Sequence, residues 1–279
     1  MDTVRAKVIY HCYHGYPPSL RAASAHLRRP LAAPRPGTDL TGRLFLAGVG
    51  SDGEEVYTLA RRGSGEIASR ALAGIAAAFG VPEGGLALVD ASRWRSPDEA
   101  VTAARQALRR TALPRPQPQD EVWPKLVYVC YGSAHSSIVA ANLHLGRLPL
   151  HRQALPDEVL AAPHFDELPH SRVGTLLDMG QDVWGHRIYA LGLGPCREAL
   201  GRGVKDLVES LGAPPGSLVL VDALSGSHPR TRVGGFLSRR LGLVRVGRPL
   251  AASGILADYG RFTALVERVL RDLDPGRSI

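Results

Sequence analysis

The sequence has little cysteine and no long apolar run. It holds three cysteines in 279 residues, and two of them, Cys12 and Cys130, occupy the same place in a repeated segment. This pattern is no disulfide framework and fits a reducing compartment. No run of 18 apolar residues is present, and the opening residues, MDTVRAKVIYHCYHG, lack the apolar stretch of a signal peptide. We therefore expect a cytoplasmic protein without a membrane partner.

Lysine is also scarce. Lys7, Lys125 and Lys205 are the only lysines among 34 basic residues, which give a formal net charge of +8. The arginines are scattered, and with abundant Ala, Gly and Pro they indicate a GC-rich genome. Basic charge alone is weak evidence for a polyanion-binding surface. The composition therefore argues against a nucleic-acid partner, although a selected basic surface stays open as the alternative.

The sequence contains an internal duplication. Residues 7–30 match residues 125–148 at 10 of 24 positions without a gap. Residues 79–91 match residues 211–223 at 8 of 13 positions. Because the two matches follow the same order along the chain, we predict two copies of one structural unit.

Each copy alternates predicted strands and helices. A β-branched and aromatic run opens the copy and leads through a loop into an Ala-rich helix. A later apolar run, LALVDA or LVLVDA, is typical of a strand buried on both faces of a parallel sheet. The predicted strands are 8–10, 44–50, 56–60 and 86–91, then 126–129, 173–181, 187–194 and 218–223; the predicted helices are 19–29, 64–80, 97–110, 136–147, 195–212 and 258–273. The alternation predicts an α/β fold of two tandem three-layer modules with mainly parallel sheets.

The two copies differ in completeness. The first module is expected to span 1–112, followed by a Pro-rich linker at 113–124. The second spans 125–279 and has a segment, 234–254, with no counterpart in the first. We interpret the first module as degenerate and the pair as a pseudo-dimer. Two independent modules on a linker are the alternative.

The strongest chemical signal is the loop 130–137, CYGSAHSS, between the first strand and helix of the second copy. Ligands of α/β sheets gather beyond the carboxyl ends of the strands, where a helix N-terminus offers unpaired N–H groups to an anion. We predict an anion site formed by Gly132, Ser133, Ser136 and Ser137. The alternative is an ordinary turn with a serine cap and a buried cysteine.

Four further residues complete this predicted site. Cys130 is a candidate nucleophile, because a helix N-terminus can activate a thiol. His135 is a candidate acid or base, with a surface histidine as the alternative. Arg239 and Arg248 are candidate guanidinium ligands, the latter in a Gly-Arg-Pro turn. In the first copy Pro17 and Pro18 remove two N–H donors from the matching loop, so we expect a working site in the second copy only.

The loop resembles two known phosphate loops of the same length. Low-molecular-weight tyrosine phosphatases carry Cys-x5-Arg-Ser between their first strand and helix, and phosphotransferase-system IIB components carry a cysteine followed by a Ser/Thr-rich loop. Cys130 falls on the cysteine of both families and Ser137 on the serine. Ser136 stands where the phosphatases have arginine, which argues against phosphatase chemistry.

A second resemblance covers nearly the whole second copy. The segments VYVCYGSAHSS (127–137), DMGQDVWGHRIYALG (178–192) and GGFLSRRLGLVRVGRPLAASG (234–254) are similar to the bacterial domain-of-unknown-function family 3189. Ser133 stands where that family leads us to expect a second glycine. The resemblance implies the fold and a cytosolic setting, and it implies no activity.

Other polar residues have ordinary explanations beside functional ones. His164 and His170 flank Asp166 and Glu167, but their spacing fits no standard metal site. Asp178 and Asp182 bracket Gly180, and Asp222, like its counterpart Asp90, ends a buried strand; turn formation and capping explain them equally well. His26 and His144 are expected to pack or cap at helix ends, and Cys196 to be buried at a helix start. We expect no metal and no cofactor.

Three functions remain open at this stage. The first is binding of a phosphorylated small molecule or nucleotide at the loop 130–137. The alternative is a non-catalytic regulatory or scaffold protein with a surface for a protein partner. A Cys-dependent phosphoryl-transfer enzyme ranks third, because the loop lacks an arginine and the chain lacks a Walker-type Gly-Lys-Ser/Thr. Whether the protein is an enzyme is therefore undecided.

Overall fold

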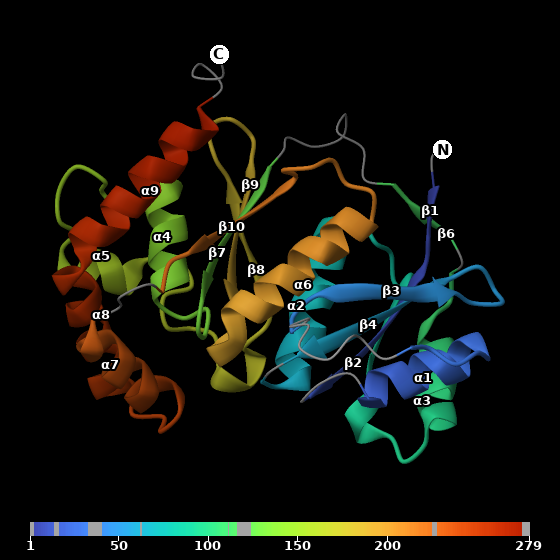
Figure 1. Cartoon of the computed structure of the whole chain (residues 1–279). Helices are drawn as coiled ribbons and strands as arrows, with labels where there is room; N and C mark the ends of the chain where they lie inside the picture. The colour runs from blue at the N-terminus through green and yellow to red at the C-terminus, as the bar shows by residue number, and fades with distance from the viewer. Residues whose placement is uncertain are drawn as a thin grey trace. The chain divides into compact units, whose positions relative to one another are not determined.

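The computed structural model divides the chain into two compact units. It describes residues 3–13, 17–32, 41–61, 63–110, 112–115, 124–224 and 228–274. Unit 1 comprises residues 1–120 with 195–217, and unit 2 comprises 121–194 with 218–279. Each unit contains a four-stranded, mainly parallel sheet with helices beside it (Figure 1). The predicted α/β fold is thus confirmed. Among the described residues, no helix is long and apolar enough to cross a membrane.

The sheet of unit 1 is centred on β2 (Lys7–Tyr13). This strand pairs in parallel with β4 (Glu55–Arg61) and β5 (Leu86–Asp90), and β3 (Leu44–Val49) pairs antiparallel with β4 at the edge. Six of the seven residues of β2 are buried, as expected for a strand covered on both faces. The carboxyl ends of β2, β4 and β5 therefore lie along one edge of this sheet.

The sheet of unit 2 repeats this topology. β7 (Lys125–Cys130) pairs in parallel with β9 (Arg187–Gly192) and β10 (Leu218–Asp222), and β8 (Leu176–Gln181) pairs antiparallel with β9. Both antiparallel edge strands are irregular at matching glycines, Gly48 and Gly180. The same strand order in both units supports the predicted duplication.

Helices cover both faces of the unit 1 sheet. One side carries α1 (Pro17–Leu27) and α3 (Pro97–Ala107), and the other carries α2 (Gly65–Ala78) and α6 (Arg197–Ser210). A short antiparallel pair, β1 (Thr3–Arg5) and β6 (Ala112–Pro114), lies apart from the main sheet. The result is the predicted three-layer arrangement.

Helix α6 comes from the second sequence copy but groups with unit 1. The expected second module, 125–279, included it. A Cβ added to Gly203 would lie 3.0 Å from the carbonyl oxygen of Gly42, so the helix backbone approaches the chain before β3 closely. Asp206 accepts a 2.8 Å bond from the amide of Leu44. These contacts join α6 to β3, and local sequence patterns carry no information on them.

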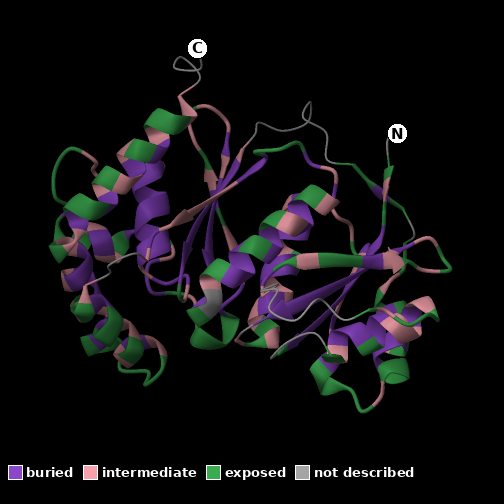
Figure 2. Ribbon diagram, viewed as in Figure 1, coloured by how far each residue is buried: buried purple, intermediate pink, exposed green. Residues whose placement is uncertain are grey.

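The core of unit 2 surrounds α4 (Ser136–His144), in which every residue is buried. It contacts β7 and β9 on one side and α9 (Tyr259–Leu273) on the other. Figure 2 shows α4 and the strands beside it as the most continuously buried part of the unit. The predicted closing helix, 258–273, is therefore confirmed as the outer cover of α4.

A helical hairpin completes unit 2. It consists of α7 (Pro229–Arg239) and α8 (Val244–Ala257), with the short α5 (Pro156–Ala161) beside α8. A Cβ at Gly234 would collide with the backbone of Ala251, and one at Gly247 would collide with the backbone of Ser238. The glycines of the 234–254 motif thus allow the two helices to approach each other closely.

Candidate functional site

Cys130 ends β7 and lies beneath the predicted loop. Its sulfur is 3.0 Å from the hydroxyl oxygen of Ser137, and the N–H of Ser133 donates a 3.1 Å bond to it. Only 3% of Cys130 is exposed. The loop therefore curls back over the sulfur and shields it from solvent.

Ser133 adopts a backbone conformation that favours glycine. Its φ is +52°, in the left-handed region, and its buried hydroxyl has no hydrogen-bond partner among the described residues. This explains why the family resemblance leads one to expect glycine at this position. Ser133 was expected in the site as a small residue that allows close backbone approach, and its left-handed conformation adds a requirement that the sequence did not reveal.

Glycines at the end of β9 support the loop. A Cβ at Gly192 would lie 2.7 Å from the carbonyl carbon of Gly132, so the two backbones approach closely. Leu193 and Gly194 donate N–H bonds of 3.0 and 2.9 Å to the carbonyls of Cys130 and Tyr131. Sequence reasoning missed Gly192, although the glycines of LGLG in a buried strand were a usable signal.

The front of the loop presents backbone donors. Within the described residues, the N–H groups of Gly132, Ala134 and His135 have no hydrogen-bond acceptor. Ser136 and Ser137 follow in the first turn of α4, where N–H groups lack helical partners. A Cβ at Gly132 would meet no atom within 4 Å, so the space before it is open. The loop thus combines free donors with open space at the carboxyl end of β7.

His135 is held by residues distant in sequence. Its Nε2 lies 2.9 Å from Oδ1 of Asp166, and its ring packs edge-on against Phe165 at 5.3 Å between centroids. Gly235 of α7 lies directly against the imidazole, because a Cβ there would fall 2.7 Å from Cε1. His135 is therefore fixed between the 162–167 stretch and α7, and the surface-histidine alternative does not hold.

Asp166 organises the polar contacts around His135. Its φ is +56°, and its N–H donates a 2.8 Å bond to the carbonyl of Ala134. Its carboxylate accepts a bond from the hydroxyl of Ser238, and its carbonyl accepts one from Arg239. Burial opposes ionisation, but hydrogen bonds from His135 and Ser238 outweigh it and hold the pKa of Asp166 below its ordinary value. This role of Asp166 could not be predicted from the sequence, where the residue stood only between two histidines whose spacing fits no standard metal site.

Arg239 and Arg248 add positive charge beside Asp166. Burial, and secondarily the Arg248 charge, lower the pKa of Arg239, whereas Asp166 raises it. Among the described residues, Nε and Nη2 of Arg239 and Nε of Arg248 are buried without a hydrogen-bond partner. Nη2 of Arg248 donates a 2.7 Å bond to the carbonyl of Leu160. Arg248 lies inside α8, so the expected Gly-Arg-Pro turn is wrong.

The remaining acidic candidates have structural partners. Asp182 accepts N–H bonds from Trp184 and His186 in the turn before β9, and Asp178 pairs with Arg187 at 3.0 Å. Asp182 lies in the turn between β8 and β9, at the end of the sheet opposite Cys130, so the turn explanation is confirmed for it, whereas Asp178 lies within β8. Asp222 lies at the same edge as Cys130 and accepts a 2.9 Å bond from the amide of Leu224.

The described part of the chain contains no metal cluster. No group of three or more His, Cys, Asp or Glu residues is arranged to hold a metal there. His164 pairs with Glu167 at 3.3 Å on the surface. The side chain of Cys196 lies outside the described residues.

Both units contain a buried tyrosine–histidine–carboxylate chain. Tyr10 bonds to His26 at 2.7 Å, which bonds to Glu54 at 2.5 Å. In unit 2, His144 stands 2.9 Å from Tyr128 and 3.2 Å from Asp182. Burial lowers the pKa of His144, opposed by Asp182. Both histidines are buried in the last turns of their helices, as expected, and they also link the central strand to a turn.

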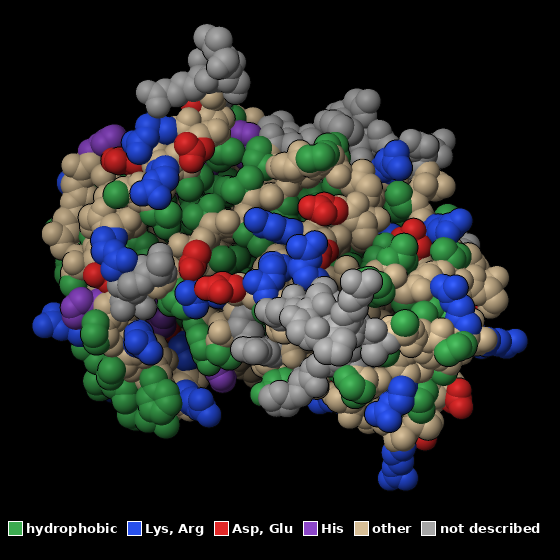
Figure 3. Space-filling model, viewed as in Figure 1, with side chains coloured by type: hydrophobic (Ala, Val, Ile, Leu, Met, Phe, Trp, Pro, Cys, Tyr) green, Lys and Arg blue, Asp and Glu red, His purple; other side chains and the backbone are tan. Residues whose placement is uncertain are grey.

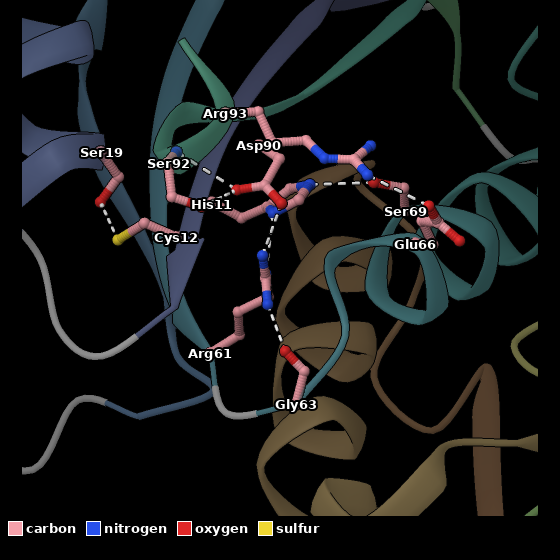
Figure 4. A network of polar contacts seen from close by, with 10 residues as sticks. All are labelled: His11, Cys12, Ser19, Arg61, Gly63, Glu66, Ser69, Asp90, Ser92 and Arg93. Carbon is pink, nitrogen blue, oxygen red and sulfur yellow. Dashed lines mark hydrogen bonds and ion pairs between the residues drawn. The ribbon is translucent and has the colours of Figure 1, made fainter. Parts of the chain in front are cut away.

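Unit 1 carries a different polar group at the matching sheet edge (Figure 4). Nε of Arg61 donates a 3.0 Å bond to Nδ1 of His11, and Nη2 lies 2.6 Å from the carboxylate of Asp90. Nη1 donates to the carbonyl of Gly63, and Nε2 of His11 lies 2.9 Å from the hydroxyl of Ser69. Arg61 ends β4, Asp90 ends β5, and His11 lies two residues before the end of β2.

The unit 1 network is closed. Arg61 always carries its protons, so Nδ1 of His11 accepts and Nε2 carries the hydrogen that is donated to Ser69. Burial lowers the pKa of His11 to about 4, with Arg61 also lowering it and Asp90 opposing. A histidine in this tautomer cannot remove a proton from Ser69. The matching positions of unit 2 hold Val129 and Leu193 instead of His11 and Arg61.

Comparison with known proteins gives one result. No curated protein matches the chain, and no solved structure does. A family model described as "Protein of unknown function (DUF3189)" matches residues 7–97 and again residues 125–271. The two matches contain the two parallel sheets and the loop above Cys130. The chain therefore belongs to the DUF3189 family of proteins of unknown function, whose unit it carries twice.

Proposed function

We propose that unit 2 binds the phosphate group of a phosphorylated small molecule or nucleotide at the loop 131–137. The observation that carries the proposal is the set of free N–H groups at Gly132, Ala134 and His135, directly before the first turn of α4. Backbone donors at a helix N-terminus form an anion site without any charged side chain. The open space before Gly132 gives the anion a place to bind.

Arg239 supports the same proposal, because its guanidinium group has a buried donor without a hydrogen-bond acceptor in the part of the chain that the structure describes. Among the described residues, its buried Nη2 has no hydrogen-bond partner, whereas its Nε faces Oδ1 of Asp166 at 3.5 Å. A buried donor left unpaired costs about 1–3 kcal/mol, so an acceptor that reached it would gain this energy. Arg239 is anchored to Asp166, which in turn bonds to Ala134 and His135 of the loop. Arg248 supports the proposal less strongly, because its guanidinium group already donates a bond to the carbonyl of Leu160.

The proposal is binding without a covalent step. Cys130 is buried, and the loop position where a phosphatase places its arginine is Ser136, which is itself 3% exposed. The phosphatase reaction uses a planar guanidinium donor for the phosphoryl oxygens, and the loop residues supply none. His135 is bonded to Asp166, which suits a positioning or anion-contact role.

Thermal unfolding of the full chain with inorganic phosphate, ADP and ATP tests the proposal. A ligand at 100 times its dissociation constant stabilises by about 2.7 kcal/mol. Gly132→Val should abolish this stabilisation, because its branched side chain fills the open space before the loop without a clash. Gly260→Val is the matched control, since its Cβ also meets no atom within 4 Å but lies on α9.

The possible outcomes distinguish binding at the loop from binding elsewhere and from no binding. Stabilisation of wild type and Gly260→Val, with none in Gly132→Val, supports the site. An equal shift in all three proteins would place the anion elsewhere and contradict the proposal. No shift with any of the three anions, in a protein that unfolds cooperatively, would also contradict it.

A further inference from the structure

The turn between α7 and α8 exposes a row of apolar side chains. Residues 240–246, here called the hairpin tip, read RLGLVRV and are all exposed. Exposed fractions reach 53% for Leu241 and 61% for Val246. Val233 and Phe236 of α7 are about half exposed and extend the apolar surface, which lies at the lower left of Figure 3 over α7. An apolar patch of this kind marks an interaction site.

The helix packing prevents these side chains from turning inward. Between α7 and α8 the space is filled by backbone, because Gly234 and Gly247 each face the other helix without room for a Cβ. The tip is also held in place by backbone bonds, such as the 2.9 Å bond from the amide of Leu243 to the carbonyl of Leu237. The large side chains of the tip are therefore fixed outward by the close approach of the two helices.

The charged residues around the tip are all basic. The sequence contains no Asp or Glu from residue 223 to residue 257. Arg240 and Arg245 belong to the tip, and Arg230 and Arg232 lie on the exposed side of α7. In the described part of the chain, none of these four side chains forms an ion pair or hydrogen bond. The surface therefore combines aliphatic side chains with unpaired guanidinium groups.

We propose that the hairpin tip docks on the surface of an anionic lipid bilayer. Leu241, Leu243 and their aliphatic neighbours would enter the boundary between headgroups and acyl chains, and the arginines would contact lipid phosphates. The contact is peripheral. It requires no membrane-crossing helix, but it departs from the expectation, based on the sequence, that the protein has no membrane partner.

Two other occupants fit the surface less well. A second copy of the chain would bring Arg240 and Arg245 against their own equivalents, with no carboxylate in the hairpin to pair with them. A protein partner favours several aromatic anchors in pockets, whereas the apolar side chains of the tip are Leu and Val, with Phe236 the one aromatic residue of the surface. A bilayer needs neither a groove nor an exact shape.

Vesicle co-sedimentation of the full chain tests the proposal. We expect binding to vesicles of phosphatidylcholine with phosphatidylglycerol, weakened by salt, and little binding to phosphatidylcholine alone. Each arginine near an anionic surface contributes about 1 kcal/mol, or about fivefold in the partition coefficient. Arg240→Gln with Arg245→Gln should therefore reduce binding by about 25-fold, and Leu241→Ser with Leu243→Ser should abolish it.

Matched variants control for charge, apolarity and the loop site. Arg268→Gln with Arg271→Gln removes two exposed arginines of α9, and Val183→Ser removes a side chain that is 90% exposed on a turn of the same unit. Both should bind vesicles as wild type does. Gly132→Val should also retain vesicle binding, which separates the tip from the proposed phosphate site.

Several results would overturn the proposal. These are no binding to anionic vesicles by the folded protein, equal binding to neutral vesicles, or unchanged binding of the tip variants with native circular dichroism. A dimer in sedimentation velocity that Leu241→Ser dissociates would assign the tip to self-association instead.

Discussion

The hydroxyl of Ser137 lies 3.0 Å from the sulfur of Cys130, and the same relationship recurs in unit 1. There the sulfur of Cys12 and the hydroxyl of Ser19 are 3.3 Å apart. The contact persists although α1 begins with two prolines, which supply no N–H to an anion. A cysteine–serine contact is thus a property of the fold in both copies, and it does not by itself indicate catalysis.

Cys130→Ser should retain phosphate binding. The serine oxygen can accept the N–H of Ser133 as the sulfur does, so the loop keeps its curvature. We expect the thermal stabilisation by inorganic phosphate to remain within about threefold of wild type in apparent affinity. Loss of binding in a protein that still unfolds cooperatively would show that the sulfur itself takes part.

Ser133→Gly should stabilise the protein. The left-handed conformation costs a non-glycine residue about 1–2 kcal/mol, part of which the greater unfolded-state freedom of glycine offsets. We expect the free energy of unfolding in urea to rise by about 0.5–1 kcal/mol. Gly192→Ala should instead lower the free energy of unfolding by about 1–3 kcal/mol, because its Cβ would meet the Gly132 backbone. A loss of stability in Ser133→Gly would contradict this account of the loop.

Asp166→Asn should weaken unit 2 in a pH-dependent manner. The pKa of Asp166 is held below its ordinary value, so its contribution is present above the unfolded-state pKa of about 4 and is lost as pH falls through the lower folded-state pKa. We expect the free energy of unfolding of the variant to be lower than that of wild type at pH 7, and this difference to become smaller in acid. Chemical denaturation of both proteins at pH 7, 5 and 3 measures the difference. Asp178→Asn is the control, since that residue is exposed.

Sequence patterns predicted the local elements better than their long-range partners. Alternation and apolar runs predicted the duplication, the paired strands and the loop at the end of β7. They did not predict that His135 meets Asp166, 31 residues away, because residues 162–170 show no periodicity. They also missed the grouping of α6 with unit 1, which depends on a glycine contact between distant segments. Contacts of this kind follow from packing in three dimensions.

Unit 1 should lose stability in mild acid through His11. The pKa of this residue is about 4 in the folded chain, against about 6.5 when unfolded. Its neutral form therefore contributes stability fully above pH 6.5, and the contribution is lost as pH falls towards 4. His11→Val with Arg61→Leu introduces the unit 2 residues at the matching positions and should remove this pH dependence. An NMR titration in which the imidazole of His11 protonates near pH 6.5 would contradict the expectation.

The last prediction concerns stoichiometry, and its basis is the contrast between the two sheet edges. At the edge of unit 1, each of the three guanidinium nitrogens of Arg61 already donates a bond, to His11, Gly63 and Asp90 respectively, so three of its five N–H donors are used within the protein. Residues 14–16 of the matching loop lie outside the described part of the chain, but Pro17 and Pro18 follow them and lack N–H groups.

Unit 2 has the reverse arrangement. At its edge Val129 and Leu193 replace His11 and Arg61, Asp222 keeps the place of Asp90, and the loop keeps free N–H groups. We therefore expect isothermal titration with the phosphate ligand that gives the largest thermal shift to yield one site per chain. Gly132→Val should reduce this number to zero. A value of two for wild type, or of one for Gly132→Val, would mean that unit 1 binds the anion as well, and that the closed His11–Arg61–Asp90 network opens to receive it.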